Sequence, residues 1–428
     1  MRPISLLCGL SKVFEKLLKR QITTHIKRFN LLSDQQAGFR QGQSVKTALL
    51  RVFDDIATAV DDKNKVALLL LDFSKAFDTI SHQQLCNKLF NNFFFSHSAV
   101  DLVRSYLTDR TQVVVCGEKI SKSAAVTSGV PQGSVLGPVL FTMYIDDLPN
   151  MLSHCKAQMF ADDVQLVCVC PGKSPADLLQ LINDDLSRLH RWASRNNLTI
   201  NHNKSKALLI GARREEHSIL PDVVIGGKHI ELTSDATNLG LIFQDDLKWD
   251  KTVSRQCGKI YSGLRTLRAL TNNMPIQTKL QLFKTLLLPH FMFADVIYMN
   301  MSLALLSKLE VALNDCVRYV YNMHRWTSVR HLQDSLLGCP FRNFHALRAC
   351  LFLHKIIRNR APNYIFNKLT PLRGTRTMGL SVPLHNTALY GESFFVRGVV
   401  YWNSLPPNLK HNISETMFKK GCTSFFNR

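Results

Sequence analysis

The sequence predicts an α+β fold whose C-terminal half is mostly helical, and three patterns support this prediction. The first is an uninterrupted apolar run at 66–71, which has the length and composition of a strand buried on both faces. The second is a pair of apolar stretches at 157–170 separated by two aspartates, as in a β-hairpin with acids at its tip. The third is a helical period of apolar residues through 174–196 and again through 252–329.

The other expected elements alternate in type along the chain. Residues 1–60 have helical spacing on either side of a polar turn at 33–44, and the glycine- and proline-containing segment 128–138 precedes another apolar helix. Residues 336–428 mix proline, glycine, arginine and aromatic side chains, and no period predicts their structure. A further helical segment is expected at 84–107, and strands are expected at 112–116, 198–210 and 223–232.

The composition favours a globular protein inside the cell, with a charge that attracts polyanions. A chain of 428 residues, 46% of them apolar, can bury one large core or several smaller ones. The formal charge of +21 attracts polyanions such as nucleic acid or an anionic membrane surface. The longest apolar stretch, 282–299, is interrupted by Lys284, His290 and Asp295, so no membrane span is expected. Eleven cysteines without a C-x-x-C pair indicate reduced thiols and no zinc finger.

Carboxylates at the ends of the apolar strands are the first candidates for chemistry. The sequence contains six Asp-Asp pairs, at 54/55, 61/62, 146/147, 162/163, 184/185 and 245/246. Five lie in polar or helical surroundings, where a solvated helix end or turn explains them. Asp162 and Asp163 instead lie between apolar stretches, and Asp72 ends the first buried strand. For either position alone, an ordinary acid in a turn explains the pattern equally well.

The conjunction of these acids favours a metal site. Unpaired buried carboxylates cost several kcal/mol each, so cations are expected to offset them. Three carboxylates on two adjacent strands can hold two Mg²⁺ ions about 3.5 to 4 Å apart, an arrangement suited to nucleotidyl transfer. The sequence therefore predicts that Asp72, Asp162 and Asp163 form one metal-binding unit.

Several motifs resemble those of reverse transcriptases and occur in the order of that family. They are LLLLDFSKAFD at 68–78, SGVPQGSVLGP at 128–138, FADD at 160–163, NHNKSK at 201–206, and the segment from NLGLIF at 238 to the tryptophan at 249. RPISLL at 2–7 and DQQAGFRQG at 34–42 resemble fingers motifs of the non-LTR, LINE-type branch. YWNSLPP at 401–407 is similar to the tail of jockey-like elements. The chain thus resembles the reverse transcriptase of a non-LTR retrotransposon.

The resemblance implies a right-hand fold with fingers, an antiparallel palm sheet and a thumb. The expected parts are fingers at 1–65 without their first strands, a palm with an interleaved fingers segment at 66–235, a primer-grip segment at 236–252, a thumb at 253–335, and a C-terminal region of unassigned role at 336–428. The implied activity is RNA-directed DNA polymerisation with two Mg²⁺ ions, or Mn²⁺ in their place. The implied partners are an RNA template, a DNA primer or target-site DNA, and deoxynucleoside triphosphates. The implied location is a cytoplasmic ribonucleoprotein or the nucleus.

The resemblance also implies roles for residues around the acids. Lys204 would protonate the leaving pyrophosphate, although Lys206 on the same strand face could serve instead, and either could be a solvated strand lysine. Arg40 would contact the triphosphate, because a guanidinium matches phosphate oxygens, unless it is a solvated loop arginine. Gln132 and Gly133 would lie near the incoming nucleotide and template, or form an ordinary turn after a proline.

Aromatic and basic residues complete the implied site. Phe73 and Phe77 would contact the substrate, with Phe77 under the sugar ring to exclude a 2′-hydroxyl; plain core packing is the alternative. The thumb helix would grip the hybrid backbone through four basic residues, although an exposed basic helix face has the same pattern. These residues are Arg255, Lys259, Arg265 and Arg268.

Other function classes remain open at this point. One is a catalytically silent nucleic-acid-binding remnant of such an element. Another is a group II intron maturase, which shares the palm, although the tail here has no Cys or His endonuclease pattern. Viral RNA-dependent RNA polymerases lack the Pro-Gln-Gly turn found at 131–133.

Overall fold

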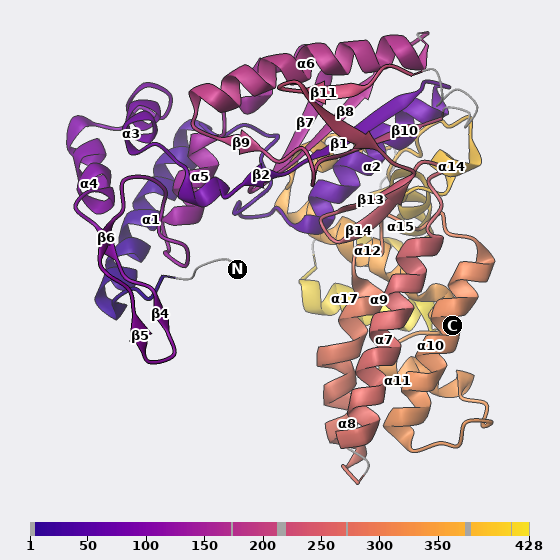
Figure 1. Cartoon of the computed structure of the whole chain (residues 1–428). Helices are drawn as coiled ribbons and strands as arrows, with labels where there is room; N and C mark the ends of the chain where they lie inside the picture. The colour runs from indigo at the N-terminus through magenta and orange to yellow at the C-terminus, as the bar shows by residue number, and fades with distance from the viewer. Residues whose placement is uncertain are drawn as a thin grey trace. The chain divides into compact units, whose positions relative to one another are not determined.

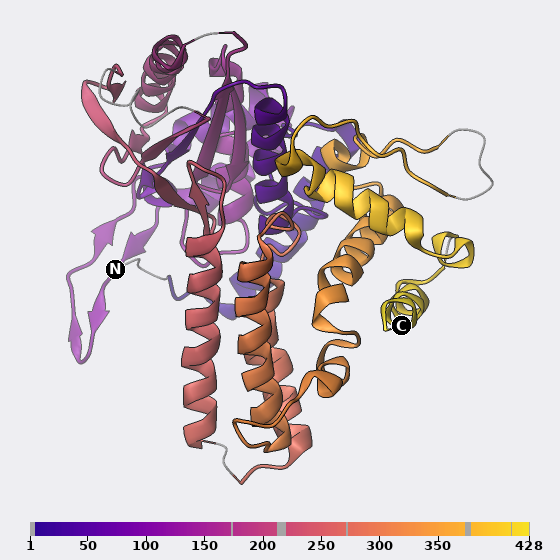
Figure 2. The same ribbon diagram turned by 90° about the vertical axis from the view of Figure 1, so that its right-hand side faces the viewer.

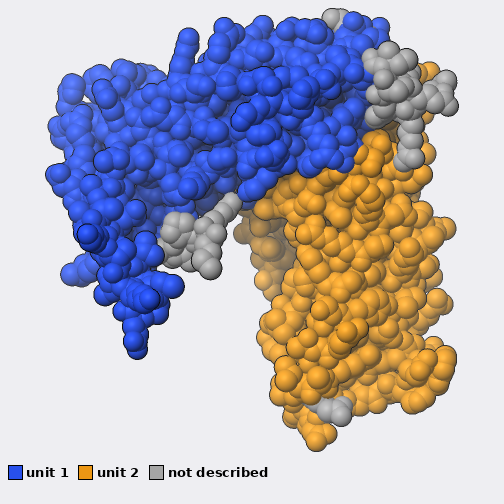
Figure 3. Space-filling model, viewed as in Figure 1, with its two compact units in different colours: residues 1–41, 65–233 blue, residues 42–64, 234–428 orange. Residues whose placement is uncertain are grey.

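The chain forms two compact units in the computed structural model. The structure describes residues 5–172, 174–211, 220–270, 273–372, 378–411 and 413–427. Unit 1 consists of residues 1–41 and 65–233, and unit 2 consists of residues 42–64 and 234–428 (Figure 3). The division falls inside the segment 1–65 that the sequence analysis treats as a single part. Within the described ranges, every helix is too short or too polar to cross a bilayer.

Unit 1 is built on a six-stranded sheet (Figure 1). In spatial order its strands are β11 (Val223–Ile225), β12 (Lys228–Leu232), β10 (Lys206–Ile210), β1 (Val66–Leu71), β8 (Asp163–Val169) and β7 (Cys155–Phe160). The apolar run of β1 takes a central position, where it pairs antiparallel with both β8 and β10. The antiparallel sheet is therefore confirmed, with one exception, since β10 and β12 are parallel.

Helix α6 (Pro175–Arg195) covers one face of this sheet (Figure 1). Its start is fixed by a capping box, in which Ser174 and Asp177 satisfy each other's backbone N–H groups. Its apolar stripe, including Leu178 and Leu186, is buried as the amphipathic pattern predicts. The other helices of unit 1 are α1 (Gly9–Phe29), η1 (Ala76–Asp78), α3 (His82–Asn91), α4 (His97–Leu107), α5 (Gly137–Tyr144) and η2 (Leu148–Met151).

Three expected elements of unit 1 are interrupted. The segment 84–107 divides into α3 and α4, because Phe93 and Phe95 turn into the core between the two helices. The strand expected at 112–116 divides into two exposed pieces, and the strand expected at 198–210 is interrupted by a turn at 201–205. The short strands are β2 (Phe73–Ser74), β3 (Thr111–Gln112), β4 (Val115–Cys116), β5 (Lys119–Ile120), β6 (Ala124–Ala125) and β9 (Thr199–Ile200).

Unit 2 is mostly helical, as the sequence predicts. Its long helices α7 and α10 pack side by side (Figures 1 and 2). A two-stranded sheet, β13 (Asp235–Asn238) with β14 (Leu241–Gln244), precedes them. The helices are α2 (Val45–Asp61), α7 (Asp250–Leu270), α8 (Ile276–Leu282), η4 (Phe283–Leu287), α9 (Leu288–Met292), α10 (Leu303–Tyr321), η5 (Arg330–Leu332), α11 (Gln333–Leu337), α12 (Phe341–Asn359), α13 (Asn363–Phe366), α14 (Ala388–Gly391), η6 (Phe394–Gly398), α15 (Val399–Ser404), α16 (Pro407–Lys410) and α17 (Glu415–Phe426).

The tail that lacked a recognisable period is also helical. In α12, buried residues occur on most of the helix surface, from Phe341 and Ala346 to Leu353 and Ile356. A helix that is buried on several sides has no polar face, so the period of 3.6 residues disappears from its sequence. This burial explains why the pattern of residues 341–359 predicted no helix.

Buried ion pairs hold unit 2 together and correct one expectation. Asp295 is fully buried and accepts bonds from Lys46 on α2 and from Arg348 on α12, the latter at 2.7 Å. Asp54 is 4% exposed and pairs with Lys368, and Asp61 accepts the backbone N–H groups of 386 and 387. The Asp-Asp doublets 54/55 and 61/62 were expected to be solvated helix ends or turns. For Asp54 and Asp61 this expectation was wrong.

Candidate active site at the ends of strands β1 and β8

The register of the sheet brings the predicted catalytic acids to one edge. Strand β1 pairs with β8 up to Leu71 opposite Val164, and one step further this register sets Asp72 across from Asp163. Strands β7 and β8 are joined by a tight turn, because Phe160 pairs with Asp163. Asp162 is the second residue of that turn. The three carboxylates therefore lie at the same end of two neighbouring strands, as predicted.

The acids are more accessible than the sequence suggested. Asp163 is exposed, Asp162 is half-buried, and the side chain of Asp72 is 27% exposed. The expectation that burial makes these charges costly was wrong, because the hydrophobic residues lie in the strands and the acids lie beyond the strand ends. Within the described ranges, no three His, Cys, Asp or Glu side chains converge as a metal-binding cluster. Mg²⁺ fits this edge through its donor chemistry, since carboxylate oxygens are the ligands it prefers.

The turn at 201–205 brings Lys204 to the same edge. The backbone N–H of Asn201 donates to the carbonyl of Asp72 at 2.7 Å, and the hydroxyl of Ser205 accepts from the Asp72 N–H at 3.3 Å. The Nζ of Lys204 lies 3.7 Å from Oδ2 of Asp72. Lys206 instead pairs with Glu231 on β12. Of the two candidate lysines, the structure therefore places Lys204 beside the acids.

The turn that carries Asp162 is held by a glutamine that sequence reasoning missed. Ala161 has a φ of 57°, a conformation that residues with a Cβ rarely adopt and that often marks functional sites. The fully buried Gln36 accepts the N–H of Ala161 at 3.2 Å and that of Gly38 at 2.7 Å through Oε1. A Cβ on Gly38 would lie 2.3 Å from the Ala161 nitrogen, so glycine is required there. Its position in the 34–42 motif was the available signal for Gln36.

Arg40 closes the same loop. Its guanidinium donates to the carbonyls of Ser33 and Gln36, and it lies 3.9 Å from Asp34. Asp146 accepts the Ser33 N–H at 3.0 Å, and burial raises the pKa of this carboxyl to about 6. Arg40 is therefore a structural arginine of the loop in this structure, with its guanidinium in contact with the protein's own oxygens.

The segment 128–133 is docked onto the turn that follows Asp72. The amide of Gln132 donates to Oδ1 of Asp78 at 2.7 Å, and a Cβ on Gly129 would lie 2.7 Å from the Asp78 backbone. Gly133 has a φ of 97°, which explains the glycine by backbone conformation. Asp78 is the last residue of the 68–78 motif, and the sequence predicted no role for it. Its carboxylate fixes the side chain of Gln132.

The two candidate aromatic residues occupy different environments. Phe73 is 4% exposed and belongs to the hydrophobic core. Phe77 is half-buried, and one face of its ring stacks on Phe141 at a centroid distance of 4.3 Å. Only Phe77 of this pair retains accessible ring surface for a ligand.

In unit 2, the four candidate basic residues of α7, Arg255, Lys259, Arg265 and Arg268, are all exposed and lie on two faces of the helix. Arg255 and Lys259 are four residues apart and share one face, and Arg265 and Arg268 share another. At 3.6 residues per turn, the two faces lie roughly 130° apart. Arg268 lines two cavities of unit 2, and Arg265 lines one of them.

Comparison with known proteins identifies the family. Residues 1–246 match the family model of reverse transcriptase (RNA-dependent DNA polymerase). The chain belongs to the reverse transcriptase family. Its predicted α+β fold and its resemblance to jockey-like, non-LTR elements are confirmed.

Relatives of this reverse transcriptase include proteins of Drosophila transposons. The probable RNA-directed DNA polymerase from transposon X-element of Drosophila melanogaster is 31% identical over 69% of this chain and 33% of that protein. The jockey polymerase of Drosophila funebris is 26% identical over 78% of this chain and 37% of that protein. A solved structure of apo telomerase from Candida tropicalis aligns with 82% of this chain and 60% of that chain, at 12% identity and a TM-score of 0.41. The reverse transcriptase described here thus spans about a third of the length of these two transposon relatives.

Proposed function

We propose that this chain is the polymerase part of a non-LTR retrotransposon protein and extends a DNA primer on an RNA template. The observation that carries the proposal is the register of β1 and β8, which sets Asp72 across from Asp163 with Asp162 in the adjoining turn. The match of residues 1–246 to the reverse transcriptase family supports the same activity.

The reaction forms a bond between the primer 3′-oxygen and the α-phosphorus and breaks the bond to pyrophosphate. Bound Mg²⁺ or Mn²⁺ would supply Lewis acidity for the hydroxyl and neutralise charge on the triphosphate. The carboxylates of Asp72, Asp162 and Asp163 would hold these ions and accept positive charge at this edge. Lys204, whose Nζ lies beside Asp72, would donate its proton to the leaving pyrophosphate.

The surrounding residues would position the incoming deoxynucleotide. Phe77 keeps one ring face against Phe141 and would present its remaining surface to the sugar. Gln132, fixed by Asp78, and Gly133 would form the wall near the template base. Arg40 would reach the triphosphate by exchanging its present carbonyl partners for phosphate oxygens, which suit a guanidinium better.

The direct test is Mg²⁺-dependent extension of a DNA primer on an RNA template by the purified chain. We expect Asp162→Asn, which removes a charge and keeps the shape, to lower the extension rate by about 10² to 10³ or more. Asp184→Asn is the matched control, because Asp184 is the exposed member of another Asp-Asp pair in the same unit. Equal rates for Asp162→Asn and wild type would contradict the assignment. Hybrid binding by a wild-type chain that extends nothing would favour a silent nucleic-acid-binding remnant.

A further inference from the structure

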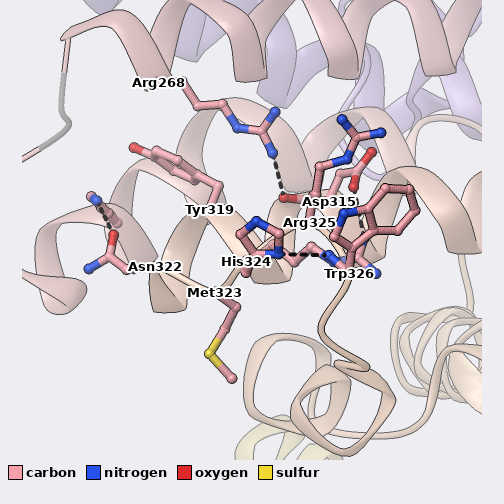
Figure 4. Close-up of a pocket in the computed structure, with 10 residues that line it drawn as sticks. Arg268, Asp315, Tyr319, Asn322, Met323, His324, Arg325 and Trp326 are labelled. Atoms are coloured by element: carbon pink, nitrogen blue, oxygen red, sulfur yellow. Dashed lines mark hydrogen bonds and ion pairs between the residues drawn. The ribbon is translucent and has the colours of Figure 1, made fainter.

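A solvent-open cavity of about 750 Å³ lies between helices of unit 2. Figure 4 shows how α7, α10 and the segment after α10 contribute side chains to it. Its lining includes four cationic side chains, a single carboxylate, and the rings of a tyrosine and a tryptophan. The cations are Arg268, Lys279, Arg318 and Arg325, the carboxylate is Asp315, and the rings are Tyr319 and Trp326.

The carboxylate of Asp315 already forms an ion pair within unit 2. Asp315 pairs with Arg318 at 2.8 Å, and the Nε of Arg318 donates to the carbonyl of Thr327 at 3.2 Å. These contacts tie the segment after α10 to the helix and neutralise Arg318. Asp315 does not offset the charges of Arg268 and Arg325 in this way. Arg268 contacts Asp315 only at its backbone carbonyl, at 3.4 Å. The cavity therefore has the charge to attract an anion.

Trp326 gives the cavity its second property. It is 76% exposed, whereas the other three tryptophans of the chain are buried. The guanidinium of Arg325 lies 4.4 Å from the centre of its indole ring, and the two side chains lie together at the cavity (Figure 4). A large flat ring left in water beside a guanidinium is an arrangement that stacks nucleobases and binds the adjacent phosphates.

A second cavity of about 320 Å³ shares Arg268 with the first. It is lined by Tyr261, Leu264, Arg265 and Arg268. Tyr261, Arg265 and Arg268 follow one another at spacings of four and three residues, so they form a row along one face of α7. The two cavities thus share Arg268, and rings and guanidinium groups line both of them.

We propose that these two cavities bind an unpaired stretch of nucleic acid, with one base stacked on Trp326 and flanking phosphates on Arg268 and Arg325. The strand must be unpaired, because the faces of bases within a duplex are already covered by their neighbours and cannot reach a protruding indole. The inference that the ligand is nucleic acid rests on the proposed function, because a reverse transcriptase also contacts template that is not paired in the hybrid. Its residues include neither the strand-end acids nor Arg255 and Lys259 of α7.

Tryptophan fluorescence tests the stacking directly, because Trp326 is the accessible indole. The full chain would be titrated with single-stranded RNA, single-stranded DNA and a fully paired RNA–DNA hybrid. We expect both single strands to quench the emission, and the RNA and DNA arms to show which strand the site prefers. Trp326→Ala lacks the reporting indole, so its affinity is measured by the fluorescence anisotropy of labelled strands. This variant should bind single strands roughly 5- to 150-fold more weakly, the effect of losing one stacked base. Trp326→Phe should keep most of the affinity.

The control is Leu384→Ala, which removes an apolar side chain that is 96% exposed and absent from both cavities. Melting temperatures of all variants would show that the chain remains folded. Unchanged single-strand affinity in Trp326→Ala, or an equal loss for the paired hybrid, would overturn the inference. A wild-type chain that binds single strands in this way and extends no primer would refute the proposed function alone, so the two failures are distinguishable.

Discussion

At the scale of single residues, Phe77 has one ring face in the core and retains surface outside it. Its stacking partner Phe141 is fully buried, whereas Phe77 is half-buried. The two rings therefore offer a matched pair for separating a role in sugar selection from a role in packing. Sequence position alone allowed both roles for Phe77.

We expect Phe77→Val to raise ribonucleotide incorporation while deoxynucleotide use stays within roughly tenfold, about 1.4 kcal/mol in the activation barrier. The reason is steric, because a ring under the sugar collides with a 2′-hydroxyl and a smaller side chain does not. The measurement is the ratio of kcat/KM for deoxy over ribo substrates. Phe141→Val should lower stability and reduce the use of both nucleotides together. An unchanged ratio in a destabilised Phe77→Val protein would assign Phe77 to the core.

Lys204 and Lys206 are a second matched pair for mutation, because they differ in their ion-pair partners. Removing a general acid typically costs about 10² to 10⁴ in rate, so we expect Lys204→Gln to slow single-nucleotide incorporation by about that factor. Lys206→Gln should stay close to wild type, because Lys206 pairs with Glu231 on the neighbouring strand. Rapid-quench measurement of a single incorporation checks both variants. A larger loss in Lys206→Gln would reverse the assignment.

At the scale of elements, the loop 33–40 supports the edge of the sheet. It adds backbone bonds to β7, with the N–H of Ala37 donating to Met159 at 2.8 Å, and it holds the Ala161 turn through Gln36. Its own start is fixed by Asp146, which accepts the N–H of Ser33. The conformation of the turn that carries Asp162 therefore depends on a loop far away in sequence.

The pKa of Asp146 makes this loop sensitive to pH. Burial raises that pKa from 3.8 to about 6, so the folded state favours the protonated carboxyl. The contribution of Asp146 to the free energy of unfolding is fully present below about pH 4. This contribution is lost as the pH rises through about 6, and the loss is at most about 3 kcal/mol for a pKa shift of this size. We expect Asp146→Asn to flatten the free energy of unfolding between these pH values. Denaturant titrations of both proteins would show it, and parallel pH profiles would contradict it.

Asp185, one member of the Asp184-Asp185 doublet, has a structural role at the turn 153–155. Asp185 is fully buried and accepts three backbone N–H groups there, at 2.8 to 2.9 Å. Burial alone would raise the pKa of Asp185, but these three donors outweigh it and hold the pKa below its usual value. The expectation of a solvated helix position was wrong for Asp185, while Asp184 beside it is exposed.

At the scale of the whole molecule, the charge of +21 makes nucleic-acid binding dependent on salt. Replacing Arg255, Lys259 and Arg265 together by glutamine should weaken hybrid binding for all sequences alike. The slope of log K against log salt should flatten by about 0.9 for each phosphate that the variant no longer neutralises. Fluorescence anisotropy at several salt concentrations measures this slope.

The control for that experiment changes the net charge equally at another surface of unit 2. Arg342, Lys419 and Lys420 are exposed and lie on α12 and α17. Their replacement by glutamine should alter the slope less than replacement of the α7 residues. Equal slopes in the two triple variants would mean that overall charge, and not helix α7 in particular, determines the binding.

The sequence by itself determined the elements that carry the acids. An apolar run long enough for one strand and a hairpin pattern with acids at its tip are local signals, because the spacing of apolar residues records which face of an element is buried. They placed Asp72, Asp162 and Asp163 at strand ends, and the motifs around them identified the family. The same local signals failed for α12, where burial on several sides erased the period.

Tertiary structure decided what those residues touch. The support of the Ala161 turn by Gln36, the contact of Gln132 with Asp78, and the position of Trp326 beside α7 all join segments distant in the chain. A hydrogen bond or ion pair depends on distances of a few ångströms between atoms, and folding alone sets those distances for residues far apart in sequence. Lys204 and Lys206 have the same chemistry and neighbouring positions, and only the packing of β10 against β12 assigned them different partners.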